Sequence, residues 1–172
     1  SSAYLLAAAM FLVPCGKLAD IHGRKRIFVC GIVIDALASL LAAVAPSSAS
    51  LIVFRFLQGM GGAMIFGTGV AILSAGYPVG ERGKALGLTV AAVYTGLSVG
   101  PFCGGLITEH FGWRWIFVSY LPLEVVILRF ARKLEGEWAE AKGERFDVRG
   151  ALLYSLSLTA IMFGFSELPK AP

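Results

Sequence analysis

Residues 2–45 read SAYLLAAAMFLVPCGKLADIHGRKRIFVCGIVIDALASLLAAVA. Two apolar runs, 2–19 and 27–45, enclose a short break that contains Arg24, Lys25 and Arg26. A helix that crosses the hydrocarbon core of a bilayer needs about 20 mostly apolar residues, which is close to the length of each run. The stretch therefore predicts two antiparallel transmembrane helices joined by a basic turn.

The same pattern continues along the rest of the chain. We expect further spanning helices near 50–76, 84–108, 114–131 and 149–168. The composition agrees, because 57% of the residues are apolar and only 15% are charged. In soluble domains, about a quarter of all residues are usually charged. The sequence thus predicts an all-α integral membrane protein with about six transmembrane helices.

Lysine and arginine residues gather in alternate breaks. The first, third and fifth breaks hold most of the 15 basic residues, whereas the second and fourth breaks and the C-terminal tail contain only Arg114 and Lys170. Cytoplasmic loops of membrane proteins are enriched in Lys and Arg. We therefore expect the odd-numbered breaks to face the cytoplasm. We expect no nucleic-acid partner, because no basic stripe with interleaved aromatic residues occurs.

Three ionisable residues, Asp35, Arg55 and Glu124, lie within the apolar runs. A charge near the bilayer centre costs about 2.5–3.5 kcal/mol on insertion scales, so such residues usually face the bundle interior or water. Arg55 either extends to the outer surface or faces the bundle interior. Asp35 either pairs with a neighbouring helix for structural reasons or is a candidate for proton coupling. Glu124 follows Pro122 by two residues and is a candidate for handling a proton or a cation.

Glycines recur at every fourth position in the run 84–108. Gly96, Gly100 and Gly104 share one helix face, Gly105 widens this face, and Pro101 lies within it. Small residues at this spacing let two helix backbones approach closely, and a proline lets a helix bend. The pattern predicts either a hinge or a plain packing surface.

The fifth break, 132–147, is the most polar stretch and is expected to be a solvated linker. It includes Glu135, Glu137, Glu140 and Glu144. Asp147 precedes the next apolar run and is a plausible N-cap. The three cysteines match no metal motif. No nucleophile–base spacing or phosphate loop occurs, so we expect no catalytic residues, no enzyme activity, no cofactor and no metal site.

Five stretches resemble a known family. Residues 16–26 resemble the loop signature of the major facilitator superfamily, between its second and third helices. Residues 55–63 resemble the fourth-helix motif of that family, and residues 96–105 the fifth-helix motif typical of its drug:proton antiporters. Residues 113–117 and 146–150 are similar to the fourteen-helix antiporter branch.

The resemblance implies an order of domains. Residues 1–131 would be family helices two to six of the N-terminal half, without the first helix. Residues 132–147 would be a cytoplasmic linker, and residues 148–172 the seventh helix, which links the halves in the fourteen-helix branch. The chain would then be a fragment whose partners are the missing first helix and the C-terminal half.

The resemblance also implies roles for residues. The conformational-switch loop would comprise Gly16, Asp20, Gly23, Arg24, Lys25 and Arg26. In relatives, the residues that resemble Asp20 and Arg24 bridge to the other half and hold one access state. The arginine that resembles Arg55 is linked to proton coupling, since a fixed cation stabilises a nearby ionised carboxylate. The Pro101 motif is associated with antiport and with sealing one side.

Together these features predict a proton-coupled efflux antiporter of small, amphipathic compounds in the plasma membrane. Its partners would be a proton, a small-molecule substrate and the lipid bilayer. Two other interpretations stay open at this level. One is a non-transporting membrane sensor or scaffold that reuses the helix bundle, and the other is an inactive truncated product.

Overall fold

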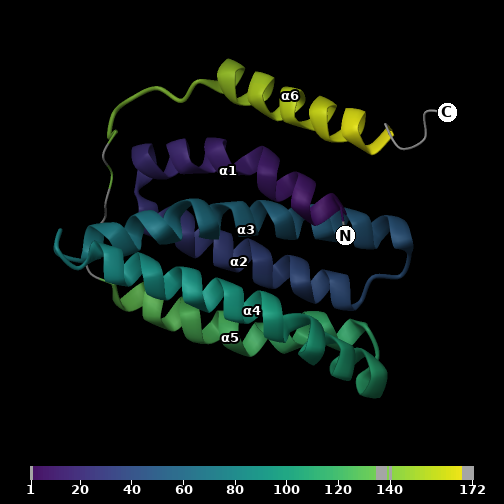
Figure 1. Ribbon diagram of the computed structural model, residues 1–172. Helices are drawn as coiled ribbons and strands as arrows, with labels where there is room; N and C mark the ends of the chain where they lie inside the picture. Colours follow the sequence, from purple (N-terminus) through teal and green to yellow (C-terminus); the bar gives the residue numbers. More distant parts are fainter. Residues whose placement is uncertain (1, 135–138, 140, 168–172) are drawn as a thin grey trace.

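The computed structural model describes residues 2–134, 139 and 141–167. Its six helices are α1 (Ser2–His22), α2 (Arg24–Ala43), α3 (Ser48–Gly76), α4 (Arg82–Phe111), α5 (Arg114–Lys133) and α6 (Val148–Glu167). The described residues contain no strand. Neighbouring helices run antiparallel, through short connections from α1 to α5 and a longer one between α5 and α6 (Figure 1). The predicted all-helical fold with six segments is confirmed. Five of the predicted linker residues, 135–138 and 140, and the predicted chain end, 168–172, lie outside the described residues.

The first two helices extend beyond the apolar runs. α1 continues to His22 and α2 begins at Arg24, so the turn between them is the single residue Gly23. The φ of Gly23 is 107°, a conformation that residues with a Cβ rarely adopt. Hydropathy falls where the hydrocarbon ends, whereas helical hydrogen bonding continues through polar residues at the interface.

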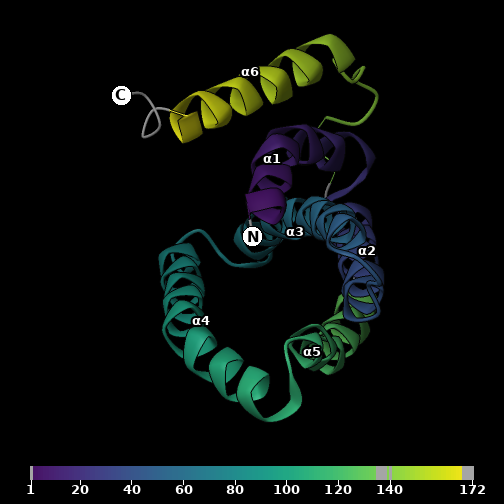
Figure 2. The same ribbon diagram turned by 90° about the vertical axis from the view of Figure 1, so that its right-hand side faces the viewer.

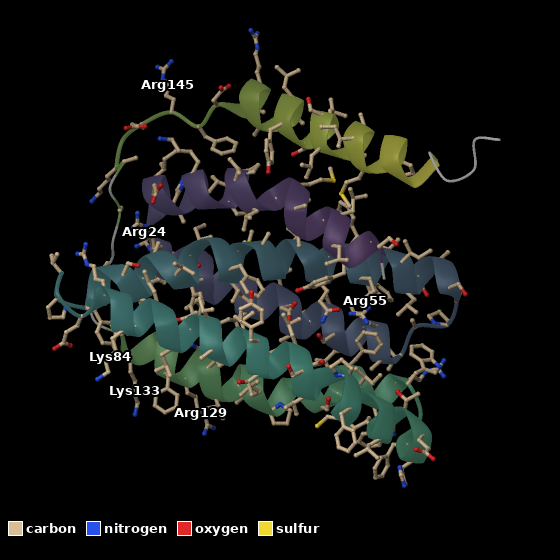
Figure 3. All side chains as sticks on the ribbon, viewed as in Figure 1. Arg24, Arg55, Lys84, Arg129, Lys133 and Arg145 are labelled. Carbon is tan, nitrogen blue, oxygen red and sulfur yellow. The ribbon has the colours of Figure 1, made fainter. Side chains whose placement is uncertain are left out.

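The basic connections lie at one end of the bundle. Figure 3 shows Arg24, Lys84, Lys133 and Arg145 at that end, whereas Arg55 lies within the bundle towards the other end. The connections between α2 and α3 and between α4 and α5 are at the opposite end (Figure 1). The structure thus places all three basic breaks on one side, as the charge pattern predicts.

Four helices, α1 to α4, are long and apolar enough to cross a bilayer. α5 carries Glu124 and four basic residues, and the described apolar part of α6, Val148–Gly164, is shorter. Large apolar side chains cover the outside of the bundle, including Leu88 at 71% exposure and Phe102 at 68%. A surface of this kind is stable in lipid and not in water, which confirms an integral membrane bundle.

Small residues bring α1, α2 and α3 into close contact. A Cβ added at Gly61 of α3 would lie 2.8 Å from the backbone nitrogen of Asp35 and 2.9 Å from the carbonyl oxygen of Gly31, both in α2. A Cβ added at Gly59 would collide with the carbonyl of Tyr4 in α1. In lipid, helices associate mainly through such packing. These three helices therefore form the rigid part that positions the polar residues described below.

α6 lies outside the other helices, against α1 (Figures 1 and 2). Pro14 lacks an N–H, so the carbonyl of Met10 has no partner within α1. The hydroxyl of Ser155 in α6 donates to this carbonyl at 3.1 Å. α6 is thus attached at the position where the proline interrupts the hydrogen bonds of α1. Asp147 accepts a hydrogen bond from the backbone nitrogen of Gly150 at 2.9 Å, which confirms the predicted N-cap of α6.

α4 stands apart from α1 and α2. Figure 2 shows α2, α3, α4 and α5 in a broad ring, with α4 joined to α3 and α5 at its ends. The helix runs without a break through Pro101. Nothing among the described residues lies within 4 Å of a Cβ added at Gly96, Gly100, Gly104 or Gly105. The role of this face as a hinge or packing surface stays a prediction.

Candidate functional site: a buried polar cluster and the turn after α1

A cluster of polar side chains lies inside the apolar bundle. It comprises Asp35 and Ser39 of α2, Arg55 and Gln58 of α3, and Glu124 of α5. Ser39 is fully buried, and Gln58 and Glu124 are 6% and 8% exposed. Buried polar groups in lipid are costly unless they are paired. The three ionisable residues that the sequence singled out separately are thus brought into one network.

Arg55 is held by α3 and α5. Its Nη1 donates to the amide oxygen of Gln58 at 3.0 Å, and its guanidinium carbon lies 4.4 Å from the centre of the Phe117 ring. A cation over an aromatic face is stabilised by the ring quadrupole. Arg55 thus contacts neighbouring side chains of α3 and α5 within the bundle.

The two carboxyl groups meet each other. The carboxyl of Asp35 lies beside the side chains of Gln58 and Glu124. The second carboxyl oxygen of Glu124, Oε2, is buried and has no hydrogen-bond partner among the described residues. Two carboxylates in direct contact repel each other when both are ionised, and a shared proton removes this repulsion. With one proton bound, the single charge of Arg55 balances the remaining carboxylate.

Three members of this site were missed by the sequence analysis, namely Ser39, Gln58 and Phe117. Gln58 lies one turn after Arg55, and Ser39 lies one turn after Asp35. Residues three or four positions apart share a helix face. The helical spacing from the two charged residues was therefore a usable signal for Gln58 and Ser39. Phe117 carries no such signal, because an aromatic residue in an apolar run is not unusual.

The predicted switch loop forms a local ion pair. Nε of Arg24 donates to Oδ1 of Asp20 at 3.0 Å, and Nη2 of Arg24 lies 2.9 Å from the same oxygen. Gly23 provides the turn between the two residues. Gly16 lies on α1 with nothing within 4 Å of an added Cβ, and Arg26 lies in the first turn of α2.

The segment between α5 and α6 is bound to this turn. Nζ of Lys17 lies 2.5 Å from Oε2 of Glu144, and the backbone nitrogen of Ala141 donates to the carbonyl of Asp20 at 3.0 Å. Nζ of Lys25 donates to the carbonyl oxygen of Leu134 at the end of α5. The polar linker therefore lies on the turn after α1 and does not extend freely into solvent at these residues.

Comparison with known proteins places the whole chain in one family. The sequence profile described as the Major Facilitator Superfamily matches residues 1–168. The chain belongs to the Major Facilitator Superfamily.

Curated relatives are similar over nearly the whole chain. The Multidrug resistance protein Stp of Mycobacterium tuberculosis is 33% identical over 98% of this chain and 32% of its own length. The puromycin resistance protein pur8 of Streptomyces alboniger is 37% identical over 96% of this chain and 33% of its own length. The riboflavin transporter RibZ of Clostridioides difficile is 33% identical over 96% of this chain and 37% of its own length. The chain thus spans about a third of the length of these relatives.

Membership in the superfamily confirms the resemblance drawn from the sequence motifs and agrees with the helical membrane bundle. The roles of individual residues are a separate question, which neither the family match nor the relatives' names address. The polar cluster lies on α2, α3 and α5, and the turn after α1 joins α1 to α2. The two sites therefore share α2, at different depths.

Proposed function

We propose that this chain is the helix-two-to-seven part of a Major Facilitator Superfamily antiporter that exports small, amphipathic compounds in exchange for protons. The observation that carries this proposal is the pair formed by the half-buried Asp35 and the buried Glu124 beside Arg55 in an otherwise apolar bundle. Titratable groups at membrane depth are costly and are retained mainly for ion or substrate pathways. Two of the relatives described above have names that refer to drug resistance, which supports export.

The charge balance of the cluster suggests how a proton is coupled. With one proton on the carboxyl pair, the cluster of Arg55, Asp35 and Glu124 is neutral. Release of the proton leaves one uncompensated negative charge in a low-dielectric site. This charge destabilises the closed packing around the pair and favours a conformation in which water or a substrate reaches it. Proton binding and release would thus bias the two access states of the transporter.

We propose that the remaining parts of the transporter are the first helix and the C-terminal half. The small-residue face of α4, with Gly96, Gly100 and Gly104, has open space beside it in the described structure. Such a face accommodates another helix at close distance. The turn after α1 would then face the other half, and the Asp20–Arg24 pair would stabilise one access state.

The test is substitution of Arg55 in the full-length parent transporter. We expect Arg55→Ala to abolish export driven by an imposed pH gradient in proteoliposomes, with unchanged expression, because the carboxyl pair loses its compensating cation. Arg114→Ala is the matched control, since Arg114 stacks on Trp113 at the outer end and is not part of the cluster. Unchanged export by Arg55→Ala would refute the coupling role. Absence of substrate flux in the wild type would favour a sensor, a scaffold or an inactive remnant.

A further inference from the structure

An apolar groove lies between α2 and α5 at the basic end of the bundle. It has a volume of about 370 Å³, and its lining comes from near the start of α2 and from the end of α5: Phe28, Ile127, Phe130, Ala131, Lys133 and Leu134. Phe130 is 70% exposed, so the groove is open on the outer side of the bundle. It shares no residue with the polar cluster.

The two walls of the groove are attached to each other and to α3. Nζ of Lys25 in α2 donates to the carbonyl oxygen of Leu134 at the end of α5, and also to that of Arg132 at 3.4 Å. A cation at this position satisfies the last carbonyl groups of a helix. The ring of Phe28 lies against Gly69 of α3, 3.6 Å from where a Cβ would be. The groove is therefore a defined feature between packed helices.

Two cations lie beside the groove. Lys133 lines it, and Arg129 precedes Lys133 by four residues and so shares a helix face with it. Figure 3 shows both side chains at the basic end of α5, directed away from the bundle. No carboxylate among the described residues forms an ion pair with either of them. The groove thus combines an apolar lining with positive charge that no described acid balances.

Orientation in the membrane does not require this arrangement. Lysine and arginine residues anywhere in a short loop contribute to topology, whereas Arg129 and Lys133 lie within α5 and on one face of it. A neighbouring transmembrane helix over the groove would bury both cations, which is costly without a carboxylate partner. A phosphate group at headgroup level would instead pair with both cations through charge-assisted hydrogen bonds and leave them at the interface.

We propose that the groove between α2 and α5 binds one anionic phospholipid of the cytoplasmic leaflet. An acyl chain lies against Phe28, Ile127 and Phe130, and the phosphate accepts hydrogen bonds from Lys133 and Arg129. Lipid tails are as apolar as the groove, so the groove determines position and gives little preference among lipids. The preference comes from charge, because basic pockets between membrane helices bind anionic headgroups. This site does not depend on the transport function proposed above.

The test is lipid binding by the present chain in detergent, with bound lipid counted by native mass spectrometry. The probes are phosphatidylglycerol and phosphatidylcholine with identical acyl chains, and we expect one phosphatidylglycerol to bind more tightly. Lys133→Gln and Arg129→Gln should each weaken this binding about fivefold, which corresponds to about 1 kcal/mol per basic residue at a membrane surface. Binding of phosphatidylcholine should not change. Lys133→Arg, which keeps the charge, should retain the preference.

Lys84→Gln is the matched control. Lys84 lies at the same end of the bundle, in the first turn of α4, and does not line the groove (Figure 3). We expect this variant to bind phosphatidylglycerol as the wild type does. Soluble glycerophosphoglycerol, which is the same headgroup without acyl chains, should not displace the lipid. A phosphatidylglycerol with a photoactivatable acyl chain should cross-link to residues 127–134 or near Phe28.

The outcomes separate a defined site from a general attraction to the basic end. Equal weakening by Lys84→Gln and Lys133→Gln, equal affinity for the two phospholipids, displacement by the soluble headgroup, or cross-links outside the two walls would each overturn the proposal. Circular dichroism identifies variants that do not fold, and the cross-links of the wild type then decide. Binding that is lost in the full-length transporter would show that another helix fills the groove, and would also overturn it. None of these results affects the test with Arg55→Ala.

Discussion

At the scale of single residues, glycines at the helix contacts are as important for the geometry of the polar cluster as the polar side chains themselves. Gly61 lies against the backbone of α2 near Asp35, and Gly59 lies against the backbone of α1. Any side chain at these positions would separate the helices that carry Asp35, Arg55 and Gln58. The geometry of the polar cluster therefore depends on two positions without a Cβ as directly as on its own hydrogen bonds.

We predict that Gly61→Val lowers the free energy of unfolding by about 1–3 kcal/mol, because the added side chain meets backbone atoms that cannot move aside. Unfolding of the chain in detergent micelles would measure this loss. Gly104→Val is the control with the same change of helix propensity, since Gly104 has open space around it. Equal stability of the two variants would contradict the close α2–α3 contact.

Among the residues of the polar cluster, the charged ones were the easiest to recognise in the sequence. A charged side chain in an apolar run is costly to place in the bilayer and is therefore conspicuous. The sequence analysis singled out Asp35, Arg55 and Glu124 for this reason. Gln58 and Ser39 are less conspicuous, since neutral polar residues in membrane helices are less costly. Which of them meet depends on the rotation of each helix about its axis, and hydropathy alone does not determine this rotation.

At the scale of helices, α6 is joined to α1 at a proline. Ser155 supplies the hydrogen bond that Pro14 denies to the carbonyl of Met10. The predicted apolar segment 149–168 identified α6, but its contact with α1 is tertiary and has no signature along the chain. The number of segments could be predicted because each crossing needs an apolar run of similar length. Their contacts could not, because lipid and protein interiors are equally apolar.

We predict that Ser155→Ala loosens α6 from α1 and lowers the free energy of unfolding by about 0.6 kcal/mol, the mean for hydrogen bonds between membrane helices. Hydrogen–deuterium exchange should show faster exchange in α6 and around Pro14. Thr159→Ala serves as control, because the hydroxyl of Thr159 bonds the carbonyl of Ser155 within α6. Unchanged exchange in the Ser155 variant would argue against this attachment.

At the scale of the whole molecule, the bundle has one tightly packed side and one open side. α1, α2 and α3 are in close contact, whereas α4 presents Gly96, Gly100 and Gly104 to open space. The repeated glycines predicted a close helix contact for α4. Its partner is not among the described residues, which is consistent with the proposal that another helix of the transporter lies there.

We predict that Gly100→Leu has opposite consequences in two contexts. In the present chain the variant should unfold at the same denaturant concentration as the wild type, because nothing lies within 4 Å of the added Cβ. In the full-length transporter it should reduce export strongly, because the side chain would block the close helix contact. Wild-type export by the full-length variant would rule out both the hinge and the packing role.

The attachment of the α5–α6 segment has a consequence for freedom of movement. Lys25 holds the segment where it leaves α5, Asp20 holds it at Ala141, and Lys17 holds it at Glu144, shortly before α6. All three anchors belong to one corner of the bundle. These contacts hold the described parts of the segment against the turn after α1. A movement of α6 away from this corner would therefore have to break them.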